Sequence, residues 1–232
     1  EIRFCDWSSD VCSSDLPAIE FLLPNDWRLS IGGAWAKGEV VTESNRHILA
    51  TGALTPVFND CYCNSSRTYE VSAEGPLFAM RGSDARLAVG AGYRENEYLQ
   101  ANYLRGTTTT SGDQNSRFAY AELHLPLISS ESGIAGAQRL EVSAAVRAED
   151  YDSFGSVSTP KLGLIYAPGS NFTLKTSWGK SFKAPTLLQQ FRAYTGQASR
   201  AATYGGAAYP ADAQVLVEAG GNPNLGPERA RF

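Results

Sequence analysis

The 232-residue sequence has little charge, one methionine, two histidines and no apolar run that approaches 18 residues. Without such a run a transmembrane helix is excluded, whereas a membrane β-barrel is not, because its signal per segment is much weaker. A formal charge of −4 argues against a non-specific nucleic-acid binder. A disordered chain is excluded by the 43% of hydrophobic and 11% of aromatic residues.

Motifs of catalysis and cofactor binding are also missing. The sequence has no GxGxxG, no phosphate-binding loop, no CxxC and no nucleophile elbow. His47 and His124 are too isolated to form a metal site, although His124 shares a face with Glu122 and is expected in a lumen. We therefore expect no enzymatic activity, no cofactor and no metal.

Residues 1–16 differ in composition from the rest of the chain. They contain Cys5 and Cys12, four acids and one base, and they show no apolar period. This segment resembles translated sequencing-adapter read-through, and a real extracellular tail is the alternative. We expect residues 1–16 not to be native and the chain to be a fragment. The remaining residues have a charge near −1 and two cysteines.

From residue 17 to residue 182, apolar and polar residues alternate with period two. Trp27, Leu29 and Ile31, for example, are separated by Arg28 and Ser30. This period is typical of strands with one apolar and one polar face, and a helical pattern fails throughout. The apolar positions, none of them charged, lie in residues 27–35, 69–77, 87–93, 119–127, 140–148, 162–166 and 172–178.

Three features favour a membrane barrel over a soluble β-sandwich. The alternating segments are about 10–12 residues long, which suits strands tilted across a bilayer. Aromatic residues lie near the segment ends, as in interfacial girdles. Tight turns near residues 24–26, 82–84 and 168–170 alternate with long loops at 39–66, at 99–116 and after 183. We therefore predict an all-β, antiparallel up-and-down transmembrane β-barrel, with about eight strands in residues 17–182.

Residues 183–232 lack this pattern and are expected to form an extracellular loop and the approach to the next strand. A short helical turn is expected near Pro185 and Thr186, and a helix over residues 211–219.

Five local motifs between residues 120 and 228 follow one another in order. They are Tyr-Ala-Glu-Leu from Tyr120, Arg-Ala-Glu-Asp-Tyr from Arg147, Pro-Lys-Leu-Gly-Leu from Pro160, Ser-Trp-Gly-Lys-Ser-Phe-Lys-Ala-Pro from Ser177, and Gly-Asn-Pro-Asn-Leu-Gly-Pro-Glu from Gly221. Together they resemble the barrel of TonB-dependent receptors, which are outer-membrane active transporters. The family motif positions are Arg147, Tyr151, Gly155, Phe182, Pro185, Asn222, Pro223, Pro227 and Glu228.

The resemblance implies a partial barrel of a presumed 22 strands in the cell outer membrane of a Gram-negative bacterium. It implies outer-membrane lipid and the TonB–ExbB–ExbD complex as partners, the latter through a plug domain that is missing here. The cargo would be a scarce solute such as a siderophore, haem, cobalamin or an oligosaccharide. A passive porin or other outer-membrane β-barrel protein is the alternative, followed by a soluble β-sandwich binding module.

Candidate sites are few. Glu149, Asp150 and Asp152 form a carboxylate cluster, which we interpret as a solvated strand end; glycoside hydrolysis and Ca²⁺ binding are alternatives. Cys61 and Cys63 are expected in an oxidising extracellular loop and are a possible disulfide or thiol pair. Three alternatives remain at this point: a disulfide between the two, disulfides to other cysteines, or binding of copper. Weak candidates for substrate binding in the loops are Arg105, Arg192 and Tyr194.

Overall fold

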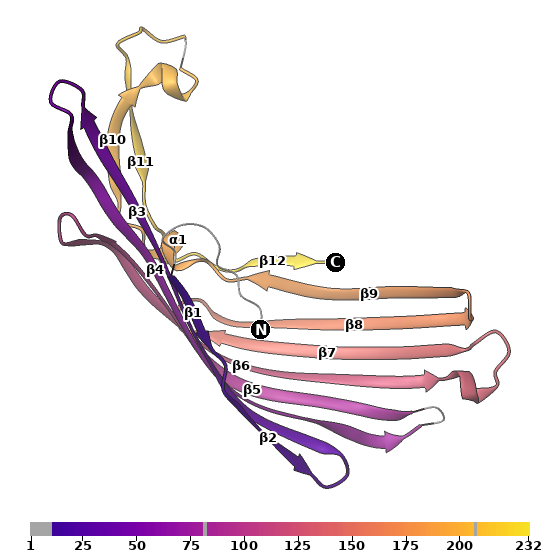
Figure 1. Ribbon diagram of the computed structural model, residues 1–232. Helices are drawn as coiled ribbons and strands as arrows, with labels where there is room; N and C mark the ends of the chain where they lie inside the picture. Colours follow the sequence, from indigo (N-terminus) through magenta and orange to yellow (C-terminus); the bar gives the residue numbers. More distant parts are fainter. Residues whose placement is uncertain (1–10, 81–82, 207) are drawn as a thin grey trace.

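The computed structural model describes residues 11–80, 83–206 and 208–232 (Figure 1). Most of the segment predicted not to be native, including Cys5, lies outside the described residues. Residues 11–15 lie inside them as a strand. The strands are β1 (Val11–Asp15), β2 (Ala18–Leu23), β3 (Trp27–Ile48), β4 (Ala53–Ala79), β5 (Asp84–Asn102), β6 (Thr107–Ile128), β7 (Arg139–Tyr151), β8 (Gly155–Gly169), β9 (Phe172–Lys183), β10 (Thr195–Arg200), β11 (Gln214–Ala219) and β12 (Glu228–Arg231).

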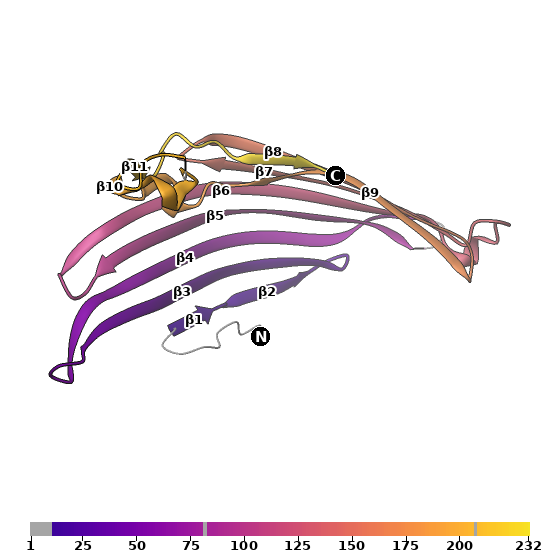
Figure 2. The same cartoon turned by 90° about the horizontal axis from the view of Figure 1, so that it is seen from above.

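Ten of these strands form one antiparallel sheet. Nine follow the order β1-β3-β4-β5-β6-β7-β8-β9-β12, and the tenth, β2, pairs with residues 27–32 at the start of β3. Consecutive strands are neighbours from β3 to β9, which confirms the predicted up-and-down topology, and residues 17–182 contain eight strands. Figure 2 shows these strands side by side in one curved layer. The sheet is not closed into a ring by the described residues, so the prediction of a partial barrel is confirmed.

The register of the sheet separates two faces. One row across five strands joins Ile31, Val71, Ala91, Ala119 and Ala148. The row beside it joins Gly32, Glu70, Gly92, Phe118 and Glu149 on the opposite face. The predicted alternation therefore describes a real apolar face and a real polar face.

We call the apolar face of residues 27–35, 69–77, 87–93, 119–127, 140–148, 162–166 and 172–178 the apolar belt. Its side chains are open to the surroundings: Ile31 is 47% exposed, Val71 45% and Leu162 51%. Water would penalise such a surface, whereas lipid favours it, and the antiparallel ladder satisfies the backbone groups that lipid cannot.

The strands continue far beyond the belt. At about 3.4 Å per residue the 22 residues of β3 extend roughly 75 Å, compared with a hydrocarbon core of about 30 Å. The prediction of long loops at 39–66 and 99–116 is wrong, because β3 and β4 turn only at residues 49–52, and β5 and β6 only at residues 103–106. Polar cross-strand pairs such as Ser65 with Glu97 (2.6 Å) replace apolar alternation there.

Beyond β9, helix α1 (Leu187–Phe191) begins at the N-cap Thr186, whose Oγ1 accepts a hydrogen bond from the Gln189 backbone N–H (3.2 Å). This confirms the helical turn expected near Pro185 and Thr186. The helix expected over residues 211–219 is wrong: β11 occupies Gln214–Ala219 and pairs with β10. Its side chains alternate between half-buried and exposed, with Val215 and Val217 on one side, and β-branched residues favour strands. Among the described residues, no helix has the length and apolar character needed to cross a membrane.

Candidate functional site

A group of closely packed side chains lies on the polar face of the sheet, at the end of the apolar belt where β7 turns into β8. We call Phe118, Arg147, Glu149, Tyr151 and Phe182 the motif cluster, because four of them belong to the five sequence motifs. Phe118 is 4% exposed, and Glu149 and Tyr151 are each 7% exposed. These three side chains are therefore withdrawn from solvent although they lie on the polar face of the sheet, whereas the Arg147 side chain is 33% exposed.

Glu149 is the charged centre of the motif cluster. It accepts hydrogen bonds from Arg147 Nε and from the Tyr151 hydroxyl (2.7 Å), and Arg94 lies 4.0 Å away. A buried carboxylate needs such partners, since an unpaired buried charge is costly. The interpretation of Glu149 as a solvated strand end is wrong for this reason.

The other two carboxylates of the predicted cluster point elsewhere. Asp150 lies on the opposite face and accepts a hydrogen bond from Ser156 Oγ (2.6 Å). Asp152 accepts one from the Asn115 backbone N–H (3.0 Å). Because Glu149 and Asp150 face opposite sides of the sheet, they do not form the facing pair that glycoside hydrolysis requires.

Two aromatic rings and two arginines complete the surroundings of Glu149. The Arg147 guanidinium lies 4.3 Å from the centre of the Phe118 ring and 5.8 Å from that of Tyr120. Arg94 lies 5.4 Å from the Phe118 ring. A Cβ at Gly92 would come within 2.5 Å of Phe118, so the glycine provides the space for that ring. The arrangement gives the guanidinium groups both a carboxylate and π faces as partners.

Tyr151 connects Glu149 to two further aromatic residues, one in the turn after β7 and one on β9. Its ring stacks on Phe154 (4.5 Å between centroids) and meets Phe182 edge-on (6.0 Å). Burial, together with the hydrogen bond to Glu149, raises the pKa of Tyr151 to about 12. The phenol therefore stays protonated and donates at any physiological pH.

The turn after β7 is fixed by contacts with β6. Gln114 Nε2 donates to Ser153 Oγ (2.8 Å), and the Asp152 backbone N–H donates to the Asn115 carbonyl (3.1 Å). Gly155 ends the turn at φ +82°, in the left-handed region that favours glycine. This explains Gly155 at its motif position.

The last two motifs meet around α1. The Gln190 side chain, 2% exposed, donates to the Pro185 carbonyl (3.1 Å), and the Asn222 backbone N–H donates to the Gln189 carbonyl (2.9 Å). Lys183 and Glu228 are register partners on β9 and β12, with Nζ and Oε1 3.6 Å apart.

The other two motif prolines lie on the short connection to β12. Pro223 is exposed and Pro227 is half-buried. The structure thus brings the motif that begins at Ser177 and the motif that begins at Gly221 together around α1 and the β9–β12 pair.

Helix α1 covers the polar face of β5 and β6. Phe191 occupies the space beside Gly112, and the Ala193 backbone N–H lies 3.5 Å from Thr110 Oγ1. Thr110 and Gln114 are 5% and 4% exposed beneath it. The sequence analysis missed this contact, because a glycine opposite a phenylalanine 79 residues away leaves no local pattern.

Of the three weak candidates for substrate binding, Arg105 lies apart from the other two. Arg105 lies in the turn between β5 and β6, where its backbone N–H donates to Asn102 (2.8 Å). Arg192 and Tyr194 follow α1 and are exposed, Tyr194 at 70%. The structure does not assemble them into one pocket.

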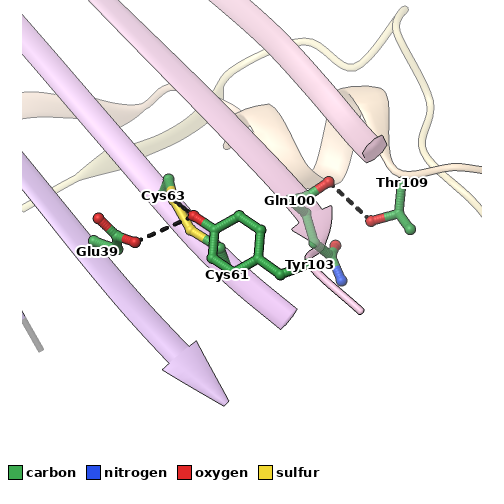
Figure 3. Close-up of a disulfide and its surroundings, with 6 residues drawn as sticks. All are labelled: Glu39, Cys61, Cys63, Gln100, Tyr103 and Thr109. Carbon is green, nitrogen blue, oxygen red and sulfur yellow. Dashed lines mark hydrogen bonds between the residues drawn. A yellow bond between two sulfur atoms is a disulfide. The ribbon is translucent and has the colours of Figure 1, made fainter. Parts of the chain in front are cut away.

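Cys61 and Cys63 form a disulfide with each other (Figure 3). They lie within β4 and not in a loop, so their predicted placement is wrong while the direct bridge, one of the open alternatives, is what the structure contains. Sequence reasoning missed Arg94, Phe118 and Gln190 as parts of this site, whereas Tyr120 is named as a motif residue. The signal for the Phe118 ring is Gly92, on the neighbouring strand.

An open antiparallel sheet with a lipid-compatible belt outside and a charged, aromatic inner face defines a section of a membrane β-barrel wall. The family described as "TonB dependent receptor-like, beta-barrel" matches residues 18–231. The chain therefore belongs to the TonB-dependent receptor β-barrel family, a family of outer-membrane proteins. Among curated proteins none matches the chain.

A solved structure is similar to this fold. It is the siderophore receptor PirA from Acinetobacter baumannii, with a TM-score of 0.62 and 17% sequence identity. The superposition covers 96% of this chain and 31% of the receptor. The chain thus spans about a third of the length of that protein, and at this identity the likeness concerns the fold.

Proposed function

We propose that the chain is part of the wall of an energised outer-membrane transporter that takes up a scarce solute. Energy would come from the TonB–ExbB–ExbD complex acting through a plug domain, and no enzymatic activity is involved. The location would be the cell outer membrane of a Gram-negative bacterium. Membership of the TonB-dependent receptor family supports each part of this proposal.

The observation that carries the proposal is the pairing of the apolar belt with the motif cluster on the opposite face of the same strands. The belt suits a lipid boundary, with Val71 and Leu162 about half exposed. Glu149, Arg147 and Phe118 form a rigid charged and aromatic surface on the side that a barrel turns toward its lumen. A wall with these two properties suits a filled lumen through which a polar solute passes.

For the cargo we propose a ferric siderophore. The similar solved structure is described as a siderophore receptor, and the exposed Arg192 and Tyr194 beside α1 offer a cation and an aromatic face to an anionic, planar chelate. Haem, cobalamin and oligosaccharides are the other classes that the test distinguishes.

The experiment is an uptake assay with the longest natural reading frame that contains this chain, expressed in a strain without its own siderophore receptors. We expect accumulation of ⁵⁵Fe supplied as siderophore complexes, lost in a tonB deletion. Arg192→Ala combined with Tyr194→Ala is expected to raise the half-saturating concentration at least tenfold. Arg139→Ala, an exposed arginine at the start of β7 that is not a binding candidate, serves as the matched control. Uptake of cobalamin or haem in place of ferric siderophore would overturn the cargo proposal alone.

The passive alternative makes a different prediction. A porin would admit small solutes at a rate proportional to their concentration and independent of TonB. Uptake that survives the tonB deletion unchanged would therefore overturn the proposal of energised transport. A soluble β-sandwich does not fit the single sheet of ten strands, whose apolar belt is exposed.

A further inference from the structure

We propose that the Cys61–Cys63 disulfide is the oxidised form of a metal site, which after reduction holds one Zn²⁺-like cation between the two thiolates and Glu39. The site lies on the outer face, above the apolar belt. It is independent of the proposed transport function.

The backbone places the two sulfurs together. Cys61 and Cys63 are two residues apart on β4, so both side chains project to the same face, with Cα atoms 5.8 Å apart. Tyr69, at the edge of the belt, is six residues further along on that face. The pair therefore lies outside the lipid region, where water and ions have access.

The neighbouring strands supply an oxygen ligand. Glu39 on β3 is the register partner of Cys63. One oxygen of Glu39 and the two sulfurs all lie within 4.8 Å of one another. Figure 3 shows the Glu39 and Tyr103 side chains turned toward the disulfide.

Tyr103 holds the carboxylate in place. Its hydroxyl donates to Glu39 Oε1 (3.2 Å) and lies 3.9 Å from Cys63 Sγ. A fixed outer partner of this kind orients a metal-binding carboxylate.

Access to the site is one-sided. Cys61 is fully buried, whereas Cys63 is half-buried and lines an open groove of about 660 Å³ with Lys37 and Glu97. An external reductant therefore reaches the sulfur of Cys63 and not that of Cys61.

The reaction balances with a small-molecule thiol as the reductant. Its thiolate attacks Cys63 Sγ, the disulfide bond breaks, and Cys61 leaves as a thiolate that takes up a proton. A second external thiol attacks the mixed disulfide, so that Cys63 is released and the two external thiols leave as their own disulfide. Two electrons pass from the external thiols to the protein. A divalent cation then displaces one proton from each cysteine.

Two thiolates and one carboxylate form a donor set for a tetrahedral d¹⁰ cation, with water as the fourth ligand. After reduction the Glu39 carboxylate disfavours nearby thiolates by like-charge repulsion, and a cation removes this repulsion. A purely structural disulfide accounts less well for the arrangement, because a loop closed over two residues restricts the unfolded chain far less than a long one.

The test is a Cd²⁺ titration of the full-length receptor in detergent, with every cysteine other than Cys61 and Cys63 replaced by serine so that only the pair contributes thiols. The protein is reduced with a thiol, which gel filtration then removes. We expect one equivalent of Cd²⁺, seen as the ultraviolet charge-transfer band of a cadmium thiolate, and none in the oxidised protein. Glu39→Gln should weaken binding at least tenfold. The matched control is Glu43→Gln, four residues further along β3, and should change it less than twofold.

Absence of a stoichiometric cadmium-thiolate band in the reduced, folded protein would overturn the proposal. So would equal affinity of the Glu39→Gln variant and the parent. Cys63→Ser should abolish the band, and its fold is checked by resistance to protease, so that loss of binding is not confused with loss of structure.

Discussion

The strands have a lower half, which carries the apolar belt, and an upper half beyond the belt, and the two halves differ in which side chains their faces carry. In the lower half, across the apolar belt, one face carries only uncharged side chains such as Ile31 and Val71. In the upper half, polar and charged side chains occur on both faces, yet the ladder continues from Glu39–Cys63 across to Leu99–Ser111. The difference indicates that lipid imposes the alternation, whereas the main-chain ladder alone sustains the strands.

Stability is distributed differently in the two halves as well. The belt buries little within the described sheet, because its apolar side chains face outward. The upper half has the motif cluster and the contact of α1 with Thr110 and Gly112, where the lowest exposures of the polar face occur. The lower half therefore gains little from packing within the sheet, whereas the upper half is held by its own packing.

The largest effect is expected from Glu149→Ala in the upper half. It removes the shared partner of Arg147, Tyr151 and Arg94, and breaking a buried ion pair costs about 3–5 kcal/mol. Urea unfolding of the full-length receptor in lipid vesicles measures the free energy of unfolding. Glu95→Ala, which disrupts the exposed pair with Arg67, is the control and should cost no more than about 1 kcal/mol. Similar losses in the two variants would contradict the buried role of Glu149.

A slightly smaller loss is expected from a charge in the lower half. Ala73→Arg places a cation at the middle of the belt on β4, at a cost of about 2–4 kcal/mol. Ser65→Arg puts the same side chain on the same face of β4, eight residues away and outside the belt, and should cost less than about 1 kcal/mol. The same vesicle assay compares the two. Equal costs would mean that the belt does not contact lipid.

Gly112→Ala tests the contact that holds α1 on the polar face. A Cβ at this position would meet the Phe191 ring, and overpacking costs about 1–3 kcal/mol. We expect faster proteolysis in residues 184–194, measured by limited digestion and mass spectrometry. Gly38→Ala, where nothing lies within 4 Å of the new Cβ, should leave the cleavage rate unchanged. Unchanged cleavage in Gly112→Ala would show that α1 does not rest on this strand.

The smallest effect is a change with pH. The raised pKa of Tyr151 means that its contribution to stability is complete below pH 10 and is lost as the pH rises from 10 to about 12. Difference absorbance of the phenolate, parent minus Tyr151→Phe, should show one late-titrating tyrosine above pH 11. A difference spectrum that titrates near pH 10 would contradict the burial of Tyr151 against Glu149.

The sequence predicted the lower half in detail. Period-two alternation located the belt residues, and the register of the sheet places each of the seven predicted segments on one face. It did not predict the upper half, because a strand with polar residues on both faces has no apolar period and cannot be told from a loop by its sequence. The backbone hydrogen bonds of the strand continue all the same. Residues 64–68 of β4, which read Asn-Ser-Ser-Arg-Thr, are such a case.

The candidate site was predictable only as a set of motif positions. The motifs named Arg147, Tyr151 and Phe182, but their convergence depends on pairing between strands far apart in sequence. Phe118 had no motif of its own, since its role depends on the missing side chain of Gly92 across the ladder. The buried state of Glu149 likewise follows from neighbours on other strands.

The central claim is that this sheet is a barrel wall with lipid on one face and a polar lumen on the other. Its most direct test is spin labelling at each residue from Tyr69 to Leu77 of β4 in the full-length receptor, reconstituted in vesicles, on a background with every native cysteine replaced. Oxygen should reach labels at Tyr69, Val71, Ala73 and Leu77, and a water-soluble nickel chelate those at Glu70, Ser72 and Glu74. Accessibility without this two-residue period would contradict the account.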